Sequence, residues 1–321
     1  MSSSLRFLNV CSHPLGGDVS AHAVRTSAPP RLPSSLVPIS RRISGLLHGD
    51  YSGLLHRAGS ELGDTRQYLE GDDVRRIDWP ATARTAETQV HDTIADHELE
   101  AWFVVDTSPS MVFGTGNGTK QQLAADVVGA LGYVVTHTGN RVGCITSGAT
   151  SRSLIPRGGT AQLAAVLAAV QPRKASGGGS SKTLSSTIDA CLAAGHRRGL
   201  VVVVSDFLDT SPWALSIARA AQKHDVIGIV VSDPREHSFN DVGIVEFRDA
   251  ENGKSAVVNT SDPRWRKAFA QKAEIRSRST IATLRGAGVD VLELRCGDDW
   301  VGELASFLRS RKRRLAVGRR R

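Results

Sequence analysis

Residues 102–111 read Trp102-Phe-Val-Val-Asp106-Thr-Ser108-Pro-Ser110-Met111. A short apolar strand therefore runs directly into one carboxylate and two hydroxyls at alternate positions. Oxygen atoms of this kind are the ligands that Mg²⁺ prefers, and Mg²⁺ keeps several waters, which leaves a position open for a further ligand. The stretch predicts a hard-cation site at the end of a buried strand, with Asp106, Ser108 and Ser110 as its first ligands.

The chain beyond this stretch alternates apolar strands with amphipathic helices. The predicted strands are Leu99–Val105, Arg141–Thr146, Leu200–Ser205, Val226–Val231 and Val289–Leu294. The predicted helices are 120–138, Thr160–Val170, Leu184–Ala194, Pro212–Lys223 and Asp262–Gly286. Since these strands are apolar throughout, both of their faces are expected to be covered. The pattern predicts an α/β fold with a doubly wound, mostly parallel sheet, and a β-hairpin insertion from Val242 to Val258 that turns at Glu251-Asn-Gly253.

A second carboxylate, Asp206, directly follows another predicted strand. Ligands of open α/β sheets collect outside the carboxyl ends of the strands, so Asp106 and Asp206 face one crevice if their strands are neighbours. Side chains after strands often only cap helices or form turns, but two carboxylates in one crevice repel unless a cation neutralises them. The loop at 177–183 offers a third hydroxyl, with Thr183 as the first choice and Ser181 as the second.

Composition divides the chain into four parts. Residues 1–39 are rich in Ser, Pro, Ala and Gly without sustained periodicity, which predicts a flexible extension. Residues 40–98 hold short apolar pieces among turn residues, which predicts a small N-terminal subdomain containing β-strands. Residues 99–309 form the main α/β domain, and residues 310–321 form a basic tail.

Two sets of residues resemble known families. Asp106-x-Ser108-x-Ser110, with a later loop hydroxyl and Asp206, resembles the metal-ion-dependent adhesion site of the von Willebrand factor A-like fold, which is Rossmann-like. Upstream, residues 64–84 are similar to the signature of the domain-of-unknown-function-58 family. The matching residues are Asp64, Arg66, Tyr68, Gly71, Asp72, Asp73, Arg75, Ile77, Asp78, Trp79 and Arg84. Further similarity at Ser205-Asp206-Phe207 and Ser232-Asp233-Pro234 extends the resemblance over residues 40–309.

The resemblance implies a metal-dependent protein-binding module rather than an enzyme. Mg²⁺, or Mn²⁺ or Ca²⁺ in its place, would be held by Ser108, Ser110 and the loop hydroxyl, with both aspartates acting partly through water. An acidic side chain of a partner would be the last ligand. Proteins of this family are commonly encoded beside AAA+ ATPases of the MoxR type, which implies such an ATPase and a client protein as partners in assembly or activation.

The sequence departs from the pattern of the von Willebrand factor A-like metal site at the third ligand. Such folds usually read Thr-Asp-Leu in this loop, whereas Lys182-Thr183-Leu184 stands here. The alignment therefore leaves Lys182 as an alternative occupant of the hydroxyl position. A lysine there would weaken metal binding.

The upstream segment also has a physical interpretation of its own. Carboxylates in a turn, together with several arginines, favour an internal ionic clasp that holds the N-terminal part against the main domain, with a separate active site as the alternative. Trp79 stands beside Pro80 and is expected to pack at this junction. The groups of the clasp are Asp72, Asp73, Arg66, Arg75 and Arg84.

Two other function classes stay open. A Mg²⁺-dependent phosphoryl hydrolase would use Asp106 as nucleophile, although Ser108 stands where haloacid dehalogenase-type hydrolases need a second acid. The isoelectric point near 9.7 suggests binding to nucleic acid or an anionic surface. Eight of the 40 basic residues lie within 309–321, however, and the rest of the chain is formally neutral. A solvated tail is the alternative, and no aromatic stacking pattern predicts specific nucleic-acid recognition.

Other classes lack their motifs. The glycine-rich loops at 114–120 and 177–183 do not have the phosphate-loop spacing and are expected to be flexible connections. There is no Gly-x-Ser-x-Gly and no HExxH, and the four cysteines, without a CxxC pair, predict buried thiols. No apolar run approaches the roughly 20 residues of a membrane span, nor is there a secretory signal, so a cytoplasmic location is expected.

Overall fold

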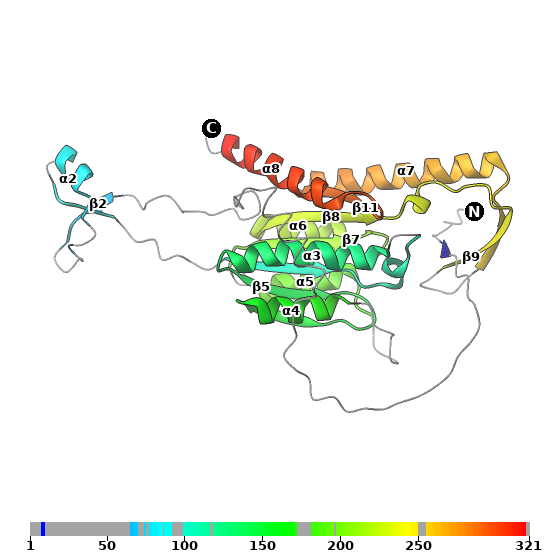
Figure 1. The fold of residues 1–321 in the computed structure, drawn as a ribbon, viewed down its shortest axis with the longest axis horizontal. Helices are drawn as coiled ribbons and strands as arrows, with labels where there is room; N and C mark the ends of the chain where they lie inside the picture. Colours follow the sequence, from blue (N-terminus) through cyan, green and yellow to red (C-terminus); the bar gives the residue numbers. More distant parts are fainter. Residues whose placement is uncertain are drawn as a thin grey trace, which may run out of the picture.

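The computed structural model describes residues 8–9, 65–69, 74, 77–85, 87–91, 99–115, 118–171, 181–195, 197–249 and 255–318. Its centre is a six-stranded sheet of order β11-β8-β7-β4-β5-β6, shown in Figure 1. The strands are β4 (Glu100–Val105), β5 (Arg141–Thr146), β6 (Ser153–Arg157), β7 (Leu200–Ser205), β8 (Asp225–Ser232) and β11 (Asp290–Arg295). Every pairing is parallel except that of β6 with β5. The predicted doubly wound, mostly parallel sheet is confirmed.

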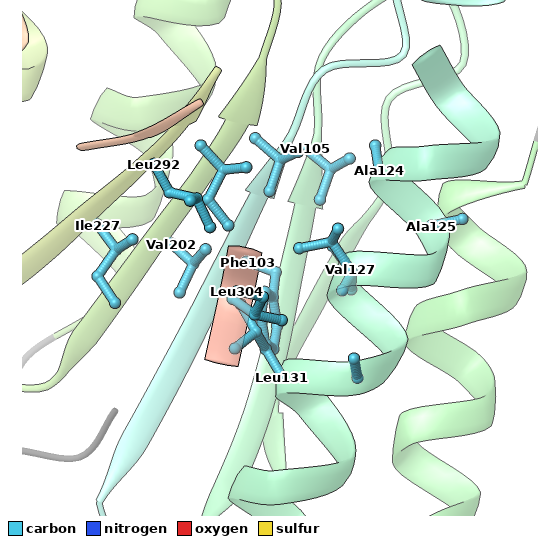
Figure 2. Close-up of a cluster of buried hydrophobic side chains, with 14 of the residues drawn as sticks. Phe103, Val105, Ala124, Ala125, Val127, Leu131, Val202, Ile227, Leu292 and Leu304 are labelled. Atoms are coloured by element: carbon cyan, nitrogen blue, oxygen red, sulfur yellow. The ribbon is translucent and has the colours of Figure 1, made fainter. Parts of the chain in front are cut away.

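Helices cover both faces of this sheet. They are α3 (Lys120–His137), α4 (Thr160–Val170), α5 (Leu184–Ala194), α6 (Trp213–Lys223), α7 (Pro263–Gly286) and α8 (Trp300–Gly318). Successive side chains of a strand point to opposite faces, so Phe103 of β4 packs with α3, α4 and α8 while its neighbour Trp102 packs with α5, α6 and α7. Figure 2 shows Phe103 beside Leu131 and Leu304 in the first of these two cores.

Two elements of the main domain were not predicted. Strand β6 is an edge strand whose exposure alternates and which contains Pro156, a residue that edge positions tolerate. Helix α8 runs through the residues expected to form the solvated tail, so the predicted domain end at residue 309 falls inside a helix. Its apolar residues, such as Leu304 and Leu308, are buried, and Arg311 is 0% exposed.

The predicted hairpin is present as β9 (Ile244–Asp249) and β10 (Ser255–Asn259), which pair antiparallel. Its expected turn at 251–253 lies outside the described residues. Strand β1 (Leu8–Asn9) adds antiparallel to β9, and the rest of the predicted N-terminal extension also lies outside the described residues. The thiols of Cys144, Cys191 and Cys296 are free and buried, as predicted for them.

The N-terminal segment contains strands, as its pattern predicts. Strand β2 (Thr65–Gln67) pairs antiparallel with β3 (Gln89–His91), and between them helix α2 (Trp79–Thr85) starts where the Asp78 carboxylate accepts a hydrogen bond from the Ala81 N–H at 3.0 Å. The expected packing of Trp79 is wrong, since this side chain is 68% exposed and the short helix buries only Ala81.

The ionic clasp of this segment stays a prediction. Several of its groups lie outside the described part of the chain, namely Asp64, Gly71, Asp72, Asp73, Arg75 and the side chain of Arg66. Arg84 is exposed on α2 and Tyr68 is half-buried. Across the described residues, no helix is both long and apolar enough to cross a membrane.

Candidate metal centre

Asp106 lies at the carboxyl end of β4, directly beside β7, and is 2% exposed. Its Oδ1 accepts hydrogen bonds from the Ser108 N–H at 2.9 Å and the Ser147 hydroxyl at 2.8 Å, and its Oδ2 accepts one from the Ser205 hydroxyl at 2.7 Å. Burial and then the charge of Asp206 raise the pKa of Asp106, which outweighs the opposite effect of these donors. The carboxylate is therefore fixed in orientation by neutral groups.

The two serines of the motif stand in front of this carboxylate. Ser108 precedes the short 3₁₀ helix η2 (Pro109–Val112), but its hydroxyl makes no capping hydrogen bond. Instead, the Ser108 and Ser110 hydroxyls hydrogen-bond to each other, with 3.0 Å between their Oγ atoms, and both side chains are half-buried. Ligands at neighbouring positions of an octahedron with bonds of about 2.1 Å are themselves about 3.0 Å apart. The hydrogen bond between the two hydroxyls thus holds them at a separation that adjacent ligands of one hard cation also have.

Asp206 follows the neighbouring strand β7 and lies close enough for its charge to raise the pKa of Asp106, so the two carboxylates lie near each other as predicted. Its negative charge is paired with the Lys120 ammonium, a group that was not among the predicted site residues. Lys120 Nζ lies 2.6 Å from Asp206 Oδ2 and 2.5 Å from Glu236 Oε1, and the lysine side chain is 0% exposed. Burial lowers the pKa of Lys120, but the charges of Asp206 and Glu236 prevail and hold it above its ordinary value.

The loop expected to give the third hydroxyl lies next to the site. The backbones of Gly148 and Lys182 bond in both directions, at 2.8 and 3.2 Å, and Gly148 follows Ser147, a donor to Asp106. Thr183 is exposed and caps α5, accepting a hydrogen bond from the Ser186 N–H at 3.2 Å. Ser181 and Lys182 are exposed too, so the Lys182 side chain is not buried beside the aspartates.

The backbone at Gly148 leaves no room for a side chain. Its φ of +89° lies in the left-handed region, and a Cβ there would be 2.9 Å from the Thr107 carbonyl oxygen. This close approach brings the loop after β5 against the loop after β4. Glycine at this position thus places the Ser147 hydroxyl within reach of Asp106.

The glycine-rich loop at 114–120 was expected to be a flexible connection. Its described residues instead make hydrogen bonds to neighbouring elements. The N–H and hydroxyl of Thr115 donate to the buried Asp233 carboxylate at 2.9 and 2.6 Å. The Lys120 N–H donates to the Phe113 carbonyl at 3.0 Å, and residues 116–117 lie outside the described part. Asp233 also begins the 3₁₀ helix η3 (Pro234–Glu236), which carries Glu236.

The structure thus brings together four of the five predicted ligands, Asp106, Ser108, Ser110 and Asp206, while the fifth, Thr183, is exposed and caps α5. No three His, Cys, Asp or Glu side chains among the described residues form a metal-binding group. A cation here would depend on hydroxyl oxygens, and the donor set, made of oxygen atoms, fits a hard cation. Four residues that contact Asp106, Asp206 or their partner were not predicted from the sequence, namely Ser147, Ser205, Lys120 and Glu236.

Comparisons with known proteins agree with the upstream signature. A family model described as "Protein of unknown function DUF58" matches residues 64–279. The uncharacterized proteins Rv1480 of Mycobacterium tuberculosis and Mb1516 of Mycobacterium bovis are each 36% identical over 294 residues, covering 90% of this chain and 92% of theirs.

Solved structures with some similarity include the hypothetical protein BatB from Bacteroides thetaiotaomicron, with a TM-score of 0.43 and 12% identity over 67% of this chain and 99% of that one. Another is a von Willebrand factor type A structure from Catenulispora acidiphila, with a TM-score of 0.33 and 14% identity over 67% of this chain and 42% of that one. The family match and the mycobacterial relatives carry the assignment: the chain belongs to the DUF58 family.

Proposed function

We propose that this protein is a metal-dependent, non-enzymatic adaptor that binds other proteins through a cation at the carboxyl end of β4. The observation that supports the proposal is the pair of Ser108 and Ser110 hydroxyls, which hydrogen-bond to each other at 3.0 Å, make no capping hydrogen bond to η2 and lie next to the buried Asp106 carboxylate. Mg²⁺ is the proposed ion, with Mn²⁺ or Ca²⁺ as substitutes.

The proposal gives each residue of the site a part. Ser108 and Ser110 would hold the ion directly, while Asp106 and Asp206 would act partly through water. The Thr183 hydroxyl would join them only by leaving its capping bond to the Ser186 N–H. When bound, the ion offers an open position to an acidic side chain of a partner. Ser147 and Ser205 keep Asp106 oriented, and the half-buried serines leave the site open toward solvent.

Family resemblance supports the choice of partners. We place the protein with an AAA+ ATPase of the MoxR type and an unidentified client that the pair assembles or activates. Because such an ATPase consumes ATP, the proposal puts the adaptor in the cytoplasm.

The hydrolase alternative finds less support in this geometry. Both oxygens of Asp106 accept hydrogen bonds and the residue is 2% exposed, whereas a nucleophile must turn an oxygen toward phosphorus. The serine at position 108 also leaves no acid where those hydrolases need one.

Recovery of the MoxR-type ATPase from the same genome tests the adaptor function. The purified ATPase is captured on the immobilised full chain in Mg²⁺ and in excess EDTA, using wild type and Ser110→Ala. We expect recovery in Mg²⁺ to fall by at least about tenfold with EDTA or with Ser110→Ala, because both remove the ion that completes the contact.

Ser279→Ala makes the same change on an exposed part of α7 and should leave recovery as in wild type. Equal recovery from every sample, EDTA included, would contradict metal-dependent binding.

A further inference from the structure

A buried ammonium group already lies in contact with two carboxylates at this end of the sheet. Lys120 is the first residue of α3, and its side chain reaches Asp206, which follows β7, and Glu236, which belongs to η3. Glu236 is itself fixed, since its Oε2 accepts a hydrogen bond from the Asp233 N–H at 3.1 Å. Three elements therefore hold the ammonium in one place.

The two aspartates of the site differ in what neutralises them. Asp106 receives hydrogen bonds from a backbone N–H and two hydroxyls, all of them neutral. Asp206 receives the Leu208 N–H on Oδ1 at 3.1 Å and the charged Lys120 on Oδ2. Arg276 of α7 also lies within electrostatic range of Asp206 and Glu236. Positive charge is concentrated on the Asp206 side of the site.

This asymmetry bears on how strongly a divalent cation can bind. An ammonium and a divalent cation that share one carboxylate repel each other, and in a partly desolvated crevice this repulsion is screened less than in water.

We propose that Lys120 is the internal counter-ion of Asp206 and that it sets the affinity of the site for divalent cations, keeping it below what two uncompensated carboxylates would give. The inference rests on the proposed cation site. It makes Lys120 a positioning residue, which acts on the metal through Asp206.

Titration of the full chain with Mn²⁺ alone tests this, using Lys120→Gln, Lys120→Arg and wild type. Removing the charge should raise the Mn²⁺ affinity at least about tenfold, whereas Lys120→Arg, which keeps the charge, should stay close to wild type. Lys223→Gln, on an exposed residue at the C-terminal end of α6, is the matched control and should change nothing.

Thermal unfolding separates this role from a purely structural one. In EDTA, Lys120→Gln should unfold at a lower temperature than wild type, because two acids lose their partner. Adding Mn²⁺ should raise the unfolding temperature of Lys120→Gln by more than it raises that of wild type, since the ion replaces the lost charge. A loss of stability that Mn²⁺ does not repair, or an unchanged affinity in folded Lys120→Gln, would overturn the inference.

If Lys120→Gln does not fold, Glu236→Gln provides the test. There Lys120 pairs with Asp206 alone and compensates it more fully, so Mn²⁺ should bind more weakly than in wild type; equal or tighter binding would overturn the inference. Failure of the cation site as a whole looks different, because no variant would then bind Mn²⁺ and Ser110→Ala would recover the ATPase like wild type.

Discussion

Arg311→Met is expected to lower the free energy of unfolding by about 3 kcal/mol, because it removes one partner of a buried ionic contact. Arg311 is 0% exposed on α8; its Nε donates to Asp290 at 2.7 Å, and a terminal guanidinium nitrogen donates to Asp225. These aspartates are the first residues of β11 and β8, so the arginine joins the last helix to two strands. Both carboxylates are about 30% exposed or less, so the expected loss of stability is at the lower end of the range for breaking a buried ion pair.

Urea unfolding at neutral pH measures this effect. Arg313→Met removes an exposed arginine two residues later on the same helix and should stay within about 0.5 kcal/mol of wild type. Similar stabilities for the two variants would show that Arg311 is not a structural link.

The buried Arg311 also changes how the basic tail should be tested for binding to nucleic acid or an anionic surface. Deleting residues 310–321 would remove this link together with the exposed charges, so lost binding would not identify a cause. Neutralising the exposed Arg313 together with Arg319, Arg320 and Arg321 leaves Arg311 in place. If salt-dependent binding to nucleic acid or an anionic surface disappears in this variant, the exposed arginines of the tail are responsible for it.

Asp106→Asn is expected to weaken Mn²⁺ binding by about 10- to 100-fold, the usual cost of losing a group that acts on a metal through its ligands. The fold should survive, because the asparagine Oδ1 can still accept from the Ser108 N–H and the Ser147 hydroxyl. Asp189→Asn makes the same change on an exposed pair with Arg219 and should leave the Mn²⁺ affinity unchanged. Unchanged affinity in Asp106→Asn would remove Asp106 from the site.

The pH dependence of stability follows from the raised pKa of Asp106, which burial and the Asp206 charge cause. An acid whose folded-state pKa lies above its unfolded value of 3.8 makes the ionised form costly in the fold, so wild type loses stability as pH rises through the folded-state pKa. In EDTA at neutral pH, Asp106→Asn should therefore be at least as stable as wild type, and its advantage should shrink as pH falls toward about 4.

Phosphate-ester turnover in Mg²⁺ that Asp106→Asn abolishes would instead support the hydrolase alternative.

Much of the fold was predictable because its strands are buried on both faces. The run from Leu200 to Ser205 is apolar apart from its last residue, and Arg141–Thr146 is apolar between its two end residues. Both strands were therefore predicted with the bounds that they have. Asp106 and Asp206 each follow the carboxyl end of a parallel strand, and such ends lie at one edge of the sheet. Their proximity was therefore predictable on the condition that β4 and β7 are neighbours, which they are.

The missed features depend on contacts that are distant in sequence. Lys120 follows a glycine-rich loop, and its partners Asp206 and Glu236 stand 86 and 116 residues later, so no local pattern could show that it points inward. Its position in the first turn of a helix whose later residues are mostly apolar was the available signal. Helix α8 was hidden by its own arginines, since its apolar face leads directly into a basic run.

Calorimetric titration of Mn²⁺ into the full chain, wild type against Ser108→Ala/Ser110→Ala, tests the cation site most directly. Both hydroxyls are half-buried and cap no helix, and the double variant removes both partners of their mutual hydrogen bond together, so it should unfold in EDTA close to the temperature of wild type. We predict one bound Mn²⁺ per wild-type chain, displaced by Mg²⁺, and none in the double variant. Equal titrations for the two proteins, or no binding to wild type, would contradict a cation site at the end of β4.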